Sequence, residues 1–547
     1  MKRRLVIHPL LLAVFPSLFI YAHNADRLSA GAIYGPTLIL LCAVSVLWLL
    51  LSLALRDASR AGLVVSLAVL LFFSFGICYL EMKLLMLEVS GGTVVAAPVL
   101  LLVLWMVILG VGGYSFARTI LDLRSLTNIA NVVGGCLVLV CLLQIAAYHL
   151  RVAPTWRPYV GEVTSRDYLT LGPEVGVAPD IYYIVLDGYA RGDTLTDIYG
   201  YDNQEFLDGL RDRGFFVASQ SHANYCQTLL SLASSLNLTY LDGLVDQVGA
   251  EYPSKGPIMK MIRSSMAFRA LESRGYETIA FASGYSGTEI TTAERYVAAR
   301  RYPDEFQTTL INMTPLPFVV PSLYDMYGWH RERILHAFEH TADPSVVDAP
   351  VFVFAHIMAP HPPFVFGRSG EEVVPEYQYV VLDGSDLVGT RGVTQEAYAR
   401  GYVEQLTFVN AKVLSMLDEI LSKSDRPTIV VLQADHGPGS MLDWDSVENS
   451  NLPERFAILN AYYLPGVDYA GLYPQISPVN TFRVIFNSYF GAHYDLLADE
   501  SYFSTAGHPY SFVRVTDHLG GRVGPDTTGW IAPQANPRWC TSGATCP

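Results

Sequence analysis

Three apolar runs of this chain end in side chains that can bind a metal. Asp187 follows IYYIVL, His356 ends VFVFAH, and the pair Asp435 and His436 follows TIVVLQA. His361 comes shortly after His356, inside the motif HPPF. Carboxylates combined with a neutral imidazole suit a divalent cation of intermediate hardness, such as Zn²⁺ or Mn²⁺. A set made only of oxygen ligands would instead indicate Mg²⁺ or Ca²⁺.

Each of these positions also has a plain structural interpretation. An aspartate before a glycine is a common turn, and a histidine at the end of a strand can be a hydrogen-bonded core residue. The combination carries more weight, because the carboxyl ends of parallel strands meet at one edge of a sheet. We therefore predict a single site there, in which Gly437 lets the chain turn away without a side chain that crowds the ion.

A candidate nucleophile lies in the segment ANYCQTLLSLASSLN, residues 223–237. Apolar residues recur at helical spacing from Leu229 onward, so a helix should begin near Thr228. A hydroxyl there would lie at the positive end of the helix dipole, which favours its alkoxide and an anionic ester beside it. Coordination to a metal would activate it further. Thr is also a good N-cap residue, and Cys226 and Ser231 are competing nucleophiles.

Alternating strands and helices would position these residues. Six apolar runs are typical of strands, at 181–186, 214–219, 278–283, 351–356, 428–433 and 457–464. Helical patterns lie between them, as at 402–423. Continuous apolar strands alternating with helices predict an α/β fold, with a mostly parallel sheet between helices.

The first 150 residues have a different composition. About half of the 547 residues are hydrophobic and only 16% are charged, and the apolar excess is concentrated in this part of the chain. Five apolar runs have the length that crosses a bilayer, about 20 residues. We place the five spans at 5–23, 33–55, 62–81, 94–116 and 129–149. The first run follows MKRR but has no small-residue cleavage site after it, so we interpret it as a retained span rather than a signal peptide.

The basic residues of the short loops are divided unevenly between the two sides of the bilayer. One side holds Lys2, Arg3, Arg4, Arg56, Arg60, Arg118 and Arg124, and the other holds Arg27 and Lys83. The positive-inside rule then places the N-terminus in the cytoplasm. Five spans place everything after them outside it, in a periplasm or the external medium.

We expect four parts along the chain: a five-helix transmembrane anchor at 1–150, a Pro/Gly-rich linker at 151–178, a catalytic domain at 179–519 and a polar tail at 520–547. Cys540 and Cys546 lie in the tail, where an oxidising compartment would let them pair. The formal net charge of −15 argues against a nucleic-acid partner. The spans hold few ionisable residues, which disfavours a transporter or channel.

Five pieces between Pro179 and Phe503 resemble a known family: PDIYYIVLDG, NYCQTLLSLASSL, FAHIMAPHPPF, LQADHG and PVNTFRVIFNSYFG. In this order they resemble the alkaline phosphatase superfamily, in particular its membrane-anchored sulfatase-like branch. That branch includes lipoteichoic acid synthases and phosphoethanolamine or phosphoglycerol transferases. The resemblance implies a metal-dependent enzyme with an extracytoplasmic domain in the cell membrane.

The resemblance also implies roles for individual residues. Asp187 matches the family's first acidic metal ligand, and Asp435 and His436 match its Asp-His ligand pair. Thr228 matches the nucleophile, which also binds the metal and is Thr, Ser or a modified Cys in relatives. One divalent ion is therefore expected, Mn²⁺ or Zn²⁺ before Ca²⁺ or Mg²⁺.

Two histidines match positions that contact the transferred group, its leaving group or a second metal in relatives. These are His356 and His361, which we predict as catalytic and substrate-binding residues. Relatives with two metals carry a further histidine after the Asp-His pair. His493 and His508 are candidates for it, although neither lies in a convincing motif, and a second metal is left open.

One departure from the family pattern concerns the nucleophile. Activated sulfatases carry a CxPxR-like motif whose cysteine is modified, but Cys226 has neither the Pro nor the Arg after it. Alignment on the helix places Thr228 on the catalytic position and Ser231 on the small residue of the motif. This departure favours phosphoryl chemistry at Thr228 over an activated sulfatase.

The sequence thus predicts a phosphoryl transferase or hydrolase that acts on phosphate esters, with phospholipid head groups as candidate substrates, at the outer membrane face. A sulfuric ester hydrolase and a non-catalytic binding protein with this fold are the alternatives. The intact set Asp187, Thr228, Asp435 and His436 argues against the non-catalytic alternative. The transferred group, the acceptor and the oligomeric state stay open.

Overall fold

A computed structural model describes residues 5–28, 30–90, 97–119, 122–163, 171–172, 177–300, 302–320, 324–343, 349–375, 379, 383–390, 392–423, 426–466 and 471–519. The chain divides into two compact units. The helical unit comprises Met1–Pro154 and Tyr302–Asp325, and the sheet unit comprises Thr155–Arg301 and Met326–Pro547. The predicted tail at 520–547, with Cys540 and Cys546, lies outside the described residues.

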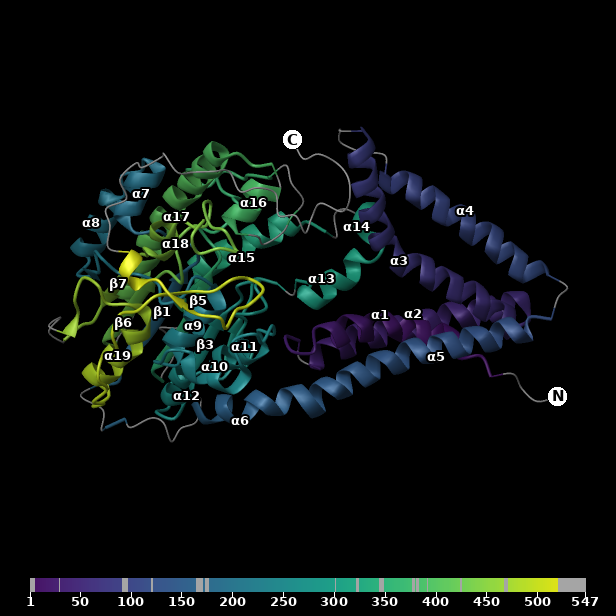
Figure 1. The fold of residues 1–547 in the computed structure, drawn as a ribbon, viewed down its shortest axis with the longest axis horizontal. Helices are drawn as coiled ribbons and strands as arrows, with labels where there is room; N and C mark the ends of the chain where they lie inside the picture. Colours follow the sequence, from purple (N-terminus) through teal and green to yellow (C-terminus); the bar gives the residue numbers. More distant parts are fainter. Residues whose placement is uncertain are drawn as a thin grey trace. The chain divides into compact units, whose positions relative to one another are not determined.

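The helical unit contains long apolar helices. They are α1 (His8–His23), α2 (Gly31–Leu55), α3 (Ala58–Ser90), α4 (Ala97–Arg118) and α5 (Arg124–Ala147), continued by a π-helical turn at Tyr148–Val152 (Figure 1). Among the described residues, four helices are long and apolar enough to cross a membrane, in the regions of α2, α3, α4 and α5. The first predicted span corresponds to α1, a shorter apolar helix of 16 residues.

The helical unit also contains a segment from much later in the chain. It holds α13 (Glu305–Asn312) and the short α14 (Leu316–Val319). Phe306 and Leu310 of α13 belong to one apolar cluster with residues of α1, α2 and α3. The sequence pattern did not predict that this segment belongs to the helical unit, because the sequences of α13 and α14 resemble those of other short helices in an α/β domain.

The predicted linker is partly helical. Helix α6 spans Ala153–Val163, inside the stretch that was expected to be irregular because of its prolines and glycines. α6 follows the π-helical turn Tyr148–Val152 directly, so the helical stretch that begins with α5 continues through Pro154. Residues 164–170 and 173–176 lie outside the described residues.

The sheet unit is built on one seven-stranded sheet in the order β2-β7-β6-β1-β5-β3-β4. Its strands are β1 (Asp180–Leu186), β2 (Phe216–Val217), β3 (Glu277–Phe281), β4 (Arg295–Val297), β5 (Val351–Ile357), β6 (Thr428–Gln433) and β7 (Asn460–Tyr463). The five strands from β6 to β4 pair in parallel, whereas β7 pairs antiparallel with both β6 and β2. A second sheet pairs β8 (Tyr502–Phe503) with β9 (Val513–Arg514). The α/β fold with a mostly parallel sheet is confirmed, and each predicted strand overlaps an observed one.

Helices lie on both faces of this sheet, as Figure 1 shows. Besides α6, the helices of the sheet unit are α7 (Gly192–Tyr199), α8 (Gln204–Asp212), α9 (Thr228–Leu236), α10 (Asp242–Val248), α11 (Gly256–Arg263), α12 (Met266–Glu272), α15 (Met326–His340), α16 (Gly384–Thr390), α17 (Gln395–Lys423), α18 (Leu452–Phe456) and α19 (Thr481–Tyr489), with 3₁₀ turns at Pro478–Asn480 and Thr516–His518.

Burial on both faces explains the continuous apolar strands. On one face, the ring of Tyr183 in β1 lies 5.2 Å from that of Phe482 in α19, and Phe352 in β5 lies 4.7 Å from Phe268 in α12. On the other face, Tyr182 and Ile184 belong to a core cluster that includes residues of α15 and α17. Alternate residues of a strand point to opposite faces, so both sets must be apolar.

Candidate active site

The three central strands bring their carboxyl ends together. In the parallel register, Val185 of β1 lies opposite His356 of β5 and opposite Gln433 of β6. Asp187 and Asp435 each follow two residues after this level, and both are buried. The structure therefore brings the ends of these separate strands together at one edge of the sheet.

Helix α9 brings the candidate nucleophile to the same edge. The helix begins at Thr228, as predicted, and Gln227 occupies the N-cap position without a side-chain capping bond. Ser231 Oγ donates to the Asp435 carbonyl at 2.7 Å, and Ser235 Oγ lies 3.0 Å from the Tyr183 hydroxyl. Residues three and four apart share one helix face, so these two serines turn Thr228 toward the strand ends.

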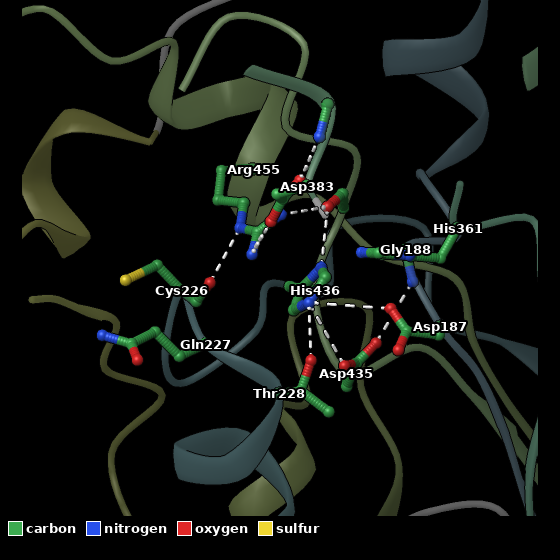
Figure 2. A network of polar contacts seen from close by, with 12 residues as sticks. Asp187, Gly188, Cys226, Gln227, Thr228, His361, Asp383, Asp435, His436 and Arg455 are labelled. Atoms are coloured by element: carbon green, nitrogen blue, oxygen red, sulfur yellow. Dashed lines mark hydrogen bonds and ion pairs between the residues drawn. The ribbon is translucent and has the colours of Figure 1, made fainter. Parts of the chain in front are cut away.

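Thr228 lies in hydrogen-bond contact with the Asp-His pair. Its Oγ1 is 2.9 Å from His436 Nε2. The same nitrogen lies 3.3 Å from an Asp435 oxygen and 3.7 Å from an Asp187 oxygen. Figure 2 shows all four side chains converging on one point. The backbone N–H of Gly188 donates to Asp435 Oδ1 at 3.2 Å, and Gly188 has a φ of 72°, which favours glycine at this turn.

Backbone carbonyls orient two of the histidines. His436 Nδ1 lies 2.9 Å from the Gly437 carbonyl, and His361 Nδ1 lies 2.6 Å from the Pro362 carbonyl. A carbonyl only accepts, so each Nδ1 carries the proton and each Nε2 keeps its lone pair when the ring is neutral. His436 Nε2 faces Thr228 and the two aspartates, which is the orientation of a metal ligand.

His356 lies against Asp187. Its Nε2 is 3.2 Å from Asp187 Oδ2, and its Nδ1 is 2.9 Å from the hydroxyl of Thr288. Ligand atoms of Asp187, His356 and Asp435 all lie within 4.8 Å of one another, which is a group that could hold a metal ion. We had expected His356 to contact substrate, and this geometry suits a metal ligand at least as well.

A second observation, the presence of buried polar atoms without a hydrogen bond, also indicates a cation site. Among the described residues, no hydrogen bond satisfies the buried atoms Asp187 Oδ1, His356 Nε2 and Asp435 Oδ2, although His356 Nε2 lies 3.2 Å from Asp187 Oδ2 and Asp435 Oδ2 lies 3.3 Å from His436 Nε2. A buried polar atom without a partner costs free energy, and several of them around one point indicate a missing ligand. A divalent cation would satisfy all three atoms at once.

The electrostatics of the site favour ionised carboxylates and a neutral His436. Burial acts to raise the pKa of Asp187, but His361, His356 and His436 around it hold that pKa well below its ordinary value. Burial, together with the Arg455 charge, lowers the pKa of His436. Metal ligands must be deprotonated, so both shifts prepare these side chains for an ion.

The competing nucleophiles are occupied elsewhere. Cys226 is buried, its Sγ lies 3.4 Å from the Ser504 carbonyl, and burial raises the pKa of its thiol. Ser231 donates to the Asp435 carbonyl. Thr228 is half-buried and faces the metal-ligating side chains, so it alone of the three has the orientation of a nucleophile.

The sequence did not predict the role of Arg455, which is buried among the loops next to the site. Its Nε donates to the Cys226 carbonyl at 2.7 Å, and its Nη1 donates to the Gly437 carbonyl at 3.2 Å. Its Nη2 forms an ion pair with Asp383 at 2.7 Å. Thr288 was also missed. Neither residue follows an apolar run, so strand-end reasoning had no signal for them.

The structure gives Gly437 a different role from the predicted one. A Cβ atom added there would lie 2.1 Å from the Glu454 carbonyl oxygen, and the Gly437 N–H donates to the Arg455 carbonyl at 2.7 Å. The neighbouring backbone of α18, rather than an ion, therefore excludes a side chain at this position.

His493 and His508 do not join the cluster. Within the described residues, the one group of three or more metal-binding side chains is Asp187, His356 and Asp435. His508 forms an ion pair with Glu251 at 2.8 Å, and its side chain is half exposed. The structure thus adds no support for a second metal at either position.

The sequence of the sheet unit matches the model of a known protein family. A family model described as Sulfatase matches residues 179–475. The chain belongs to the sulfatase family, within the alkaline phosphatase superfamily of hydrolases and transferases. The predicted family resemblance is confirmed, and so is the prediction of an enzyme.

Several solved structures are similar to the chain at low identity. Lipooligosaccharide phosphoethanolamine transferase A from Neisseria meningitidis is 12% identical with a TM-score of 0.37, covering 88% of this chain and 93% of its own. A zinc complex of the periplasmic domain of EptC from Escherichia coli is 13% identical with a TM-score of 0.41, covering 64% and 98%. The lipoteichoic acid synthase LtaP from Listeria monocytogenes is 14% identical with a TM-score of 0.35, covering 63% and 82%. No curated protein matches the sequence.

The family assignment and the four apolar helices together indicate a membrane protein with a C-terminal soluble domain. The family's chemistry is transfer or hydrolysis at a phosphoryl or sulfuryl centre, and the Asp/His/Asp group could hold the metal that this chemistry uses. The individual site residues remain predictions.

Proposed function

We propose that the chain is a metal-dependent phosphoryl transferase or hydrolase in which Thr228 is the nucleophile. The observation that carries this proposal is the contact of 2.9 Å between Thr228 Oγ1 and His436 Nε2, beside two buried carboxylates. Thr228 is the first residue of α9, where the helix dipole favours an alkoxide and an anionic ester.

The residues that would hold the metal are Asp187, Asp435 and His436, together with Thr228 and His356. The ion would polarise a phosphoryl oxygen and lower the pKa of the Thr228 hydroxyl. Zn²⁺ or Mn²⁺ suits this mixture of carboxylates and imidazoles best. The carboxylates and the backbone-oriented His436 keep the hydroxyl at one place, so that the nucleophile is positioned before substrate arrives.

The proposed reaction has two displacements. Thr228 Oγ1 gives its proton to solvent water and forms a bond to phosphorus, while the bond from phosphorus to the leaving oxygen breaks. His361 with both ring nitrogens protonated is placed to give that oxygen the proton on Nε2, because its Nδ1–H is held by the Pro362 carbonyl. In the second displacement, water or an acceptor hydroxyl forms a bond to phosphorus and gives its proton to the now neutral His361. The bond from phosphorus to Thr228 Oγ1 breaks, and that oxygen takes up a proton from solvent.

We place this reaction at the outer face of the membrane, on phospholipid head groups. The positive-inside distribution of basic residues supports a cytoplasmic N-terminus and, with α1 counted as a fifth span, an extracytoplasmic sheet unit. A membrane anchor holds the site near lipid and raises the effective concentration of a lipid donor. Transfer from phosphatidylglycerol or phosphatidylethanolamine would leave diacylglycerol.

Hydrolysis of a sulfuric ester is the second candidate function, because the matching family model is that of sulfatases. The burial of Cys226 disfavours it, since that cysteine does not take the place of a modified nucleophile. The two functions differ in product: a sulfatase releases sulfate from an aryl sulfate, whereas the transferase releases diacylglycerol from labelled phospholipid.

The proposal is tested with the purified full chain, vesicles of labelled phosphatidylglycerol and phosphatidylethanolamine, and either Zn²⁺ or Mn²⁺. Thr228→Ala should lower diacylglycerol release by about 10³-fold or more, and Thr228→Ser should retain part of it. Mass spectrometry of the Thr228 peptide should show an adduct whose mass identifies the transferred group. Unchanged turnover in Thr228→Ala would overturn the role of this residue.

A further inference from the structure

The segment Tyr302–Asp325 leaves the sheet unit and is built into the helical unit. We infer that this segment is a second membrane anchor, embedded beside α3, whose outward apolar side chains contact lipid acyl chains. The inference rests on the proposed membrane function, and it concerns a part of the chain that contributes nothing to the metal site.

The closest contact is between two backbones. The N–H of Gly76, inside α3, donates to the carbonyl of Met313 at 3.0 Å. A Cβ atom added to Gly76 would lie 1.9 Å from the carbonyl oxygen of Asn312, a distance that no side chain can occupy. Gly76 lies within the stretch Ala58–Met82, which is apolar enough to cross a membrane. The segment therefore meets α3 within its membrane-spanning stretch, where lipid offers no hydrogen bonds to free backbone groups.

Aromatic and aliphatic side chains fix the segment on this site. Phe306 and Leu310 of α13 are buried in the cluster formed with α1, α2 and α3. The ring of Phe318 in α14 lies 4.6 Å from that of Tyr79 and 5.7 Å from that of Phe75, both on α3. These contacts bury the inner side of the segment and leave its outer side uncovered.

The outer side of α14 is apolar and exposed. Val319 is 58% exposed and Leu316 is 37% exposed, in a helix of sequence LPFV that carries no polar side chain. Elsewhere on α3, Ile77 and Leu80 are also exposed apolar residues. Because α14 packs on α3, a helix that is long and apolar enough to span a bilayer, we assign the acyl-chain region of the membrane as the partner of its outer side, rather than water or a protein.

This anchor adds to the number of chain connections between the two units. The chain passes from one unit to the other after Pro154, after Arg301 and after Asp325. A domain joined to a membrane anchor by one flexible linker can take many positions relative to the bilayer. Three chain connections reduce the range of those positions. We therefore expect the segment to matter for substrates that lie in the membrane and not for substrates in solution.

Photocrosslinking tests where the segment lies. The full chain carries p-benzoylphenylalanine at Val319 or, as a control with matched exposure, at Val374 of the sheet unit, which is 62% exposed. Each protein is reconstituted in vesicles of phosphatidylglycerol and phosphatidylethanolamine and irradiated. We expect lipid adducts at Val319 and several-fold fewer at Val374. Equal adduct levels at the two positions would overturn the inference, and a protein without transferase activity would still give the expected difference.

Substitution of the glycine contact tests the effect on substrates. Gly76→Leu should expel the segment and reduce turnover of lipid donors by about tenfold, while turnover of a soluble aryl phosphodiester changes by less than about twofold. Gly110→Leu is the matched control, because a Cβ atom at Gly110 in α4 meets nothing within 4 Å. An equal loss on both substrates would contradict the anchor, and so would an equal effect of the two glycine substitutions.

Discussion

The imidazole of His356 has a polar neighbour at each of its nitrogens. Nε2 faces Asp187 and the candidate metal position, and Nδ1 contacts Thr288 Oγ1 at 2.9 Å. The Thr288 hydroxyl can donate to the Tyr285 carbonyl at 3.3 Å, which leaves its lone pair to accept from Nδ1–H. In the tautomer with the proton on Nδ1, Thr288 accepts from Nδ1–H and Nε2 presents its lone pair to an ion, as groups behind metal ligands generally arrange.

Thr288→Val should therefore weaken metal binding without disturbing the fold. We expect the affinity for Zn²⁺ or Mn²⁺, measured by competition with a chelating dye, to fall by about 10- to 100-fold. Thr288→Ser keeps the hydroxyl and should retain most of the affinity. An affinity of Thr288→Val within about twofold of the parent would show that His356 needs no partner at Nδ1, or that it is not a ligand.

At the scale of elements, the site depends on loops that are tied together by one buried arginine. Arg455 in α18 bonds the carbonyls of Cys226, two residues before α9 begins, and of Gly437, just beyond β6. It also pairs with Asp383 next to α16. One side chain thus fixes the segments that carry Thr228 and His436 relative to each other.

Arg455→Met should lower the stability of the protein strongly, by about 3–5 kcal/mol, because it leaves Asp383 buried without its partner. The double variant Arg455→Met with Asp383→Leu removes both charges and should recover much of that loss. Thermal unfolding of the full chain in detergent measures both variants. A single variant that melts with the parent protein would show that the pair contributes little to this region.

The sequence predicted elements better than it predicted their contacts. Six strands and the helix beginning at Thr228 were found because apolar periodicity reports burial directly. The strand-end rule then gathered Asp187, His356 and Asp435, which the structure brings together. The roles of Arg455 and Thr288 were not predicted, because they depend on contacts between loops that are far apart in the sequence. The segment at 302–325 escaped because local pattern does not show which unit a short helix joins.

At the scale of the whole molecule, the metal should contribute to stability. The candidate ligands come from β1, β5 and the loop after β6, so an ion bound among them would join the centre of the sheet unit and favour the folded state. Zn²⁺ or Mn²⁺ at about 100 times its dissociation constant should stabilise the protein by about 2.7 kcal/mol, and a chelator should remove that gain.

The control for this experiment is Asp435→Asn, which lacks one ligand charge and should show little response to either ion. Melting temperatures with chelator and with each metal, compared between the two proteins, provide the measurement. An increase of the same size in Asp435→Asn would place the stabilising ion elsewhere.

The strand order means that residues far apart in the sequence form the site, so they are synthesised at different times. Gly188 and Asp435 hydrogen-bond across 247 residues of sequence, and β1 lies between β5 and β6, which are both made long after it. During synthesis, the part of the chain that carries Asp187 and Thr228 is thus made long before the part that carries Asp435 and His436. No ion can meet the full ligand set until the central strands have paired, since pairing over such separations comes late in folding. Metal binding would then occur only in a completed domain, and a chain whose synthesis stopped before β6 would lack two of the candidate ligands, Asp435 and His436.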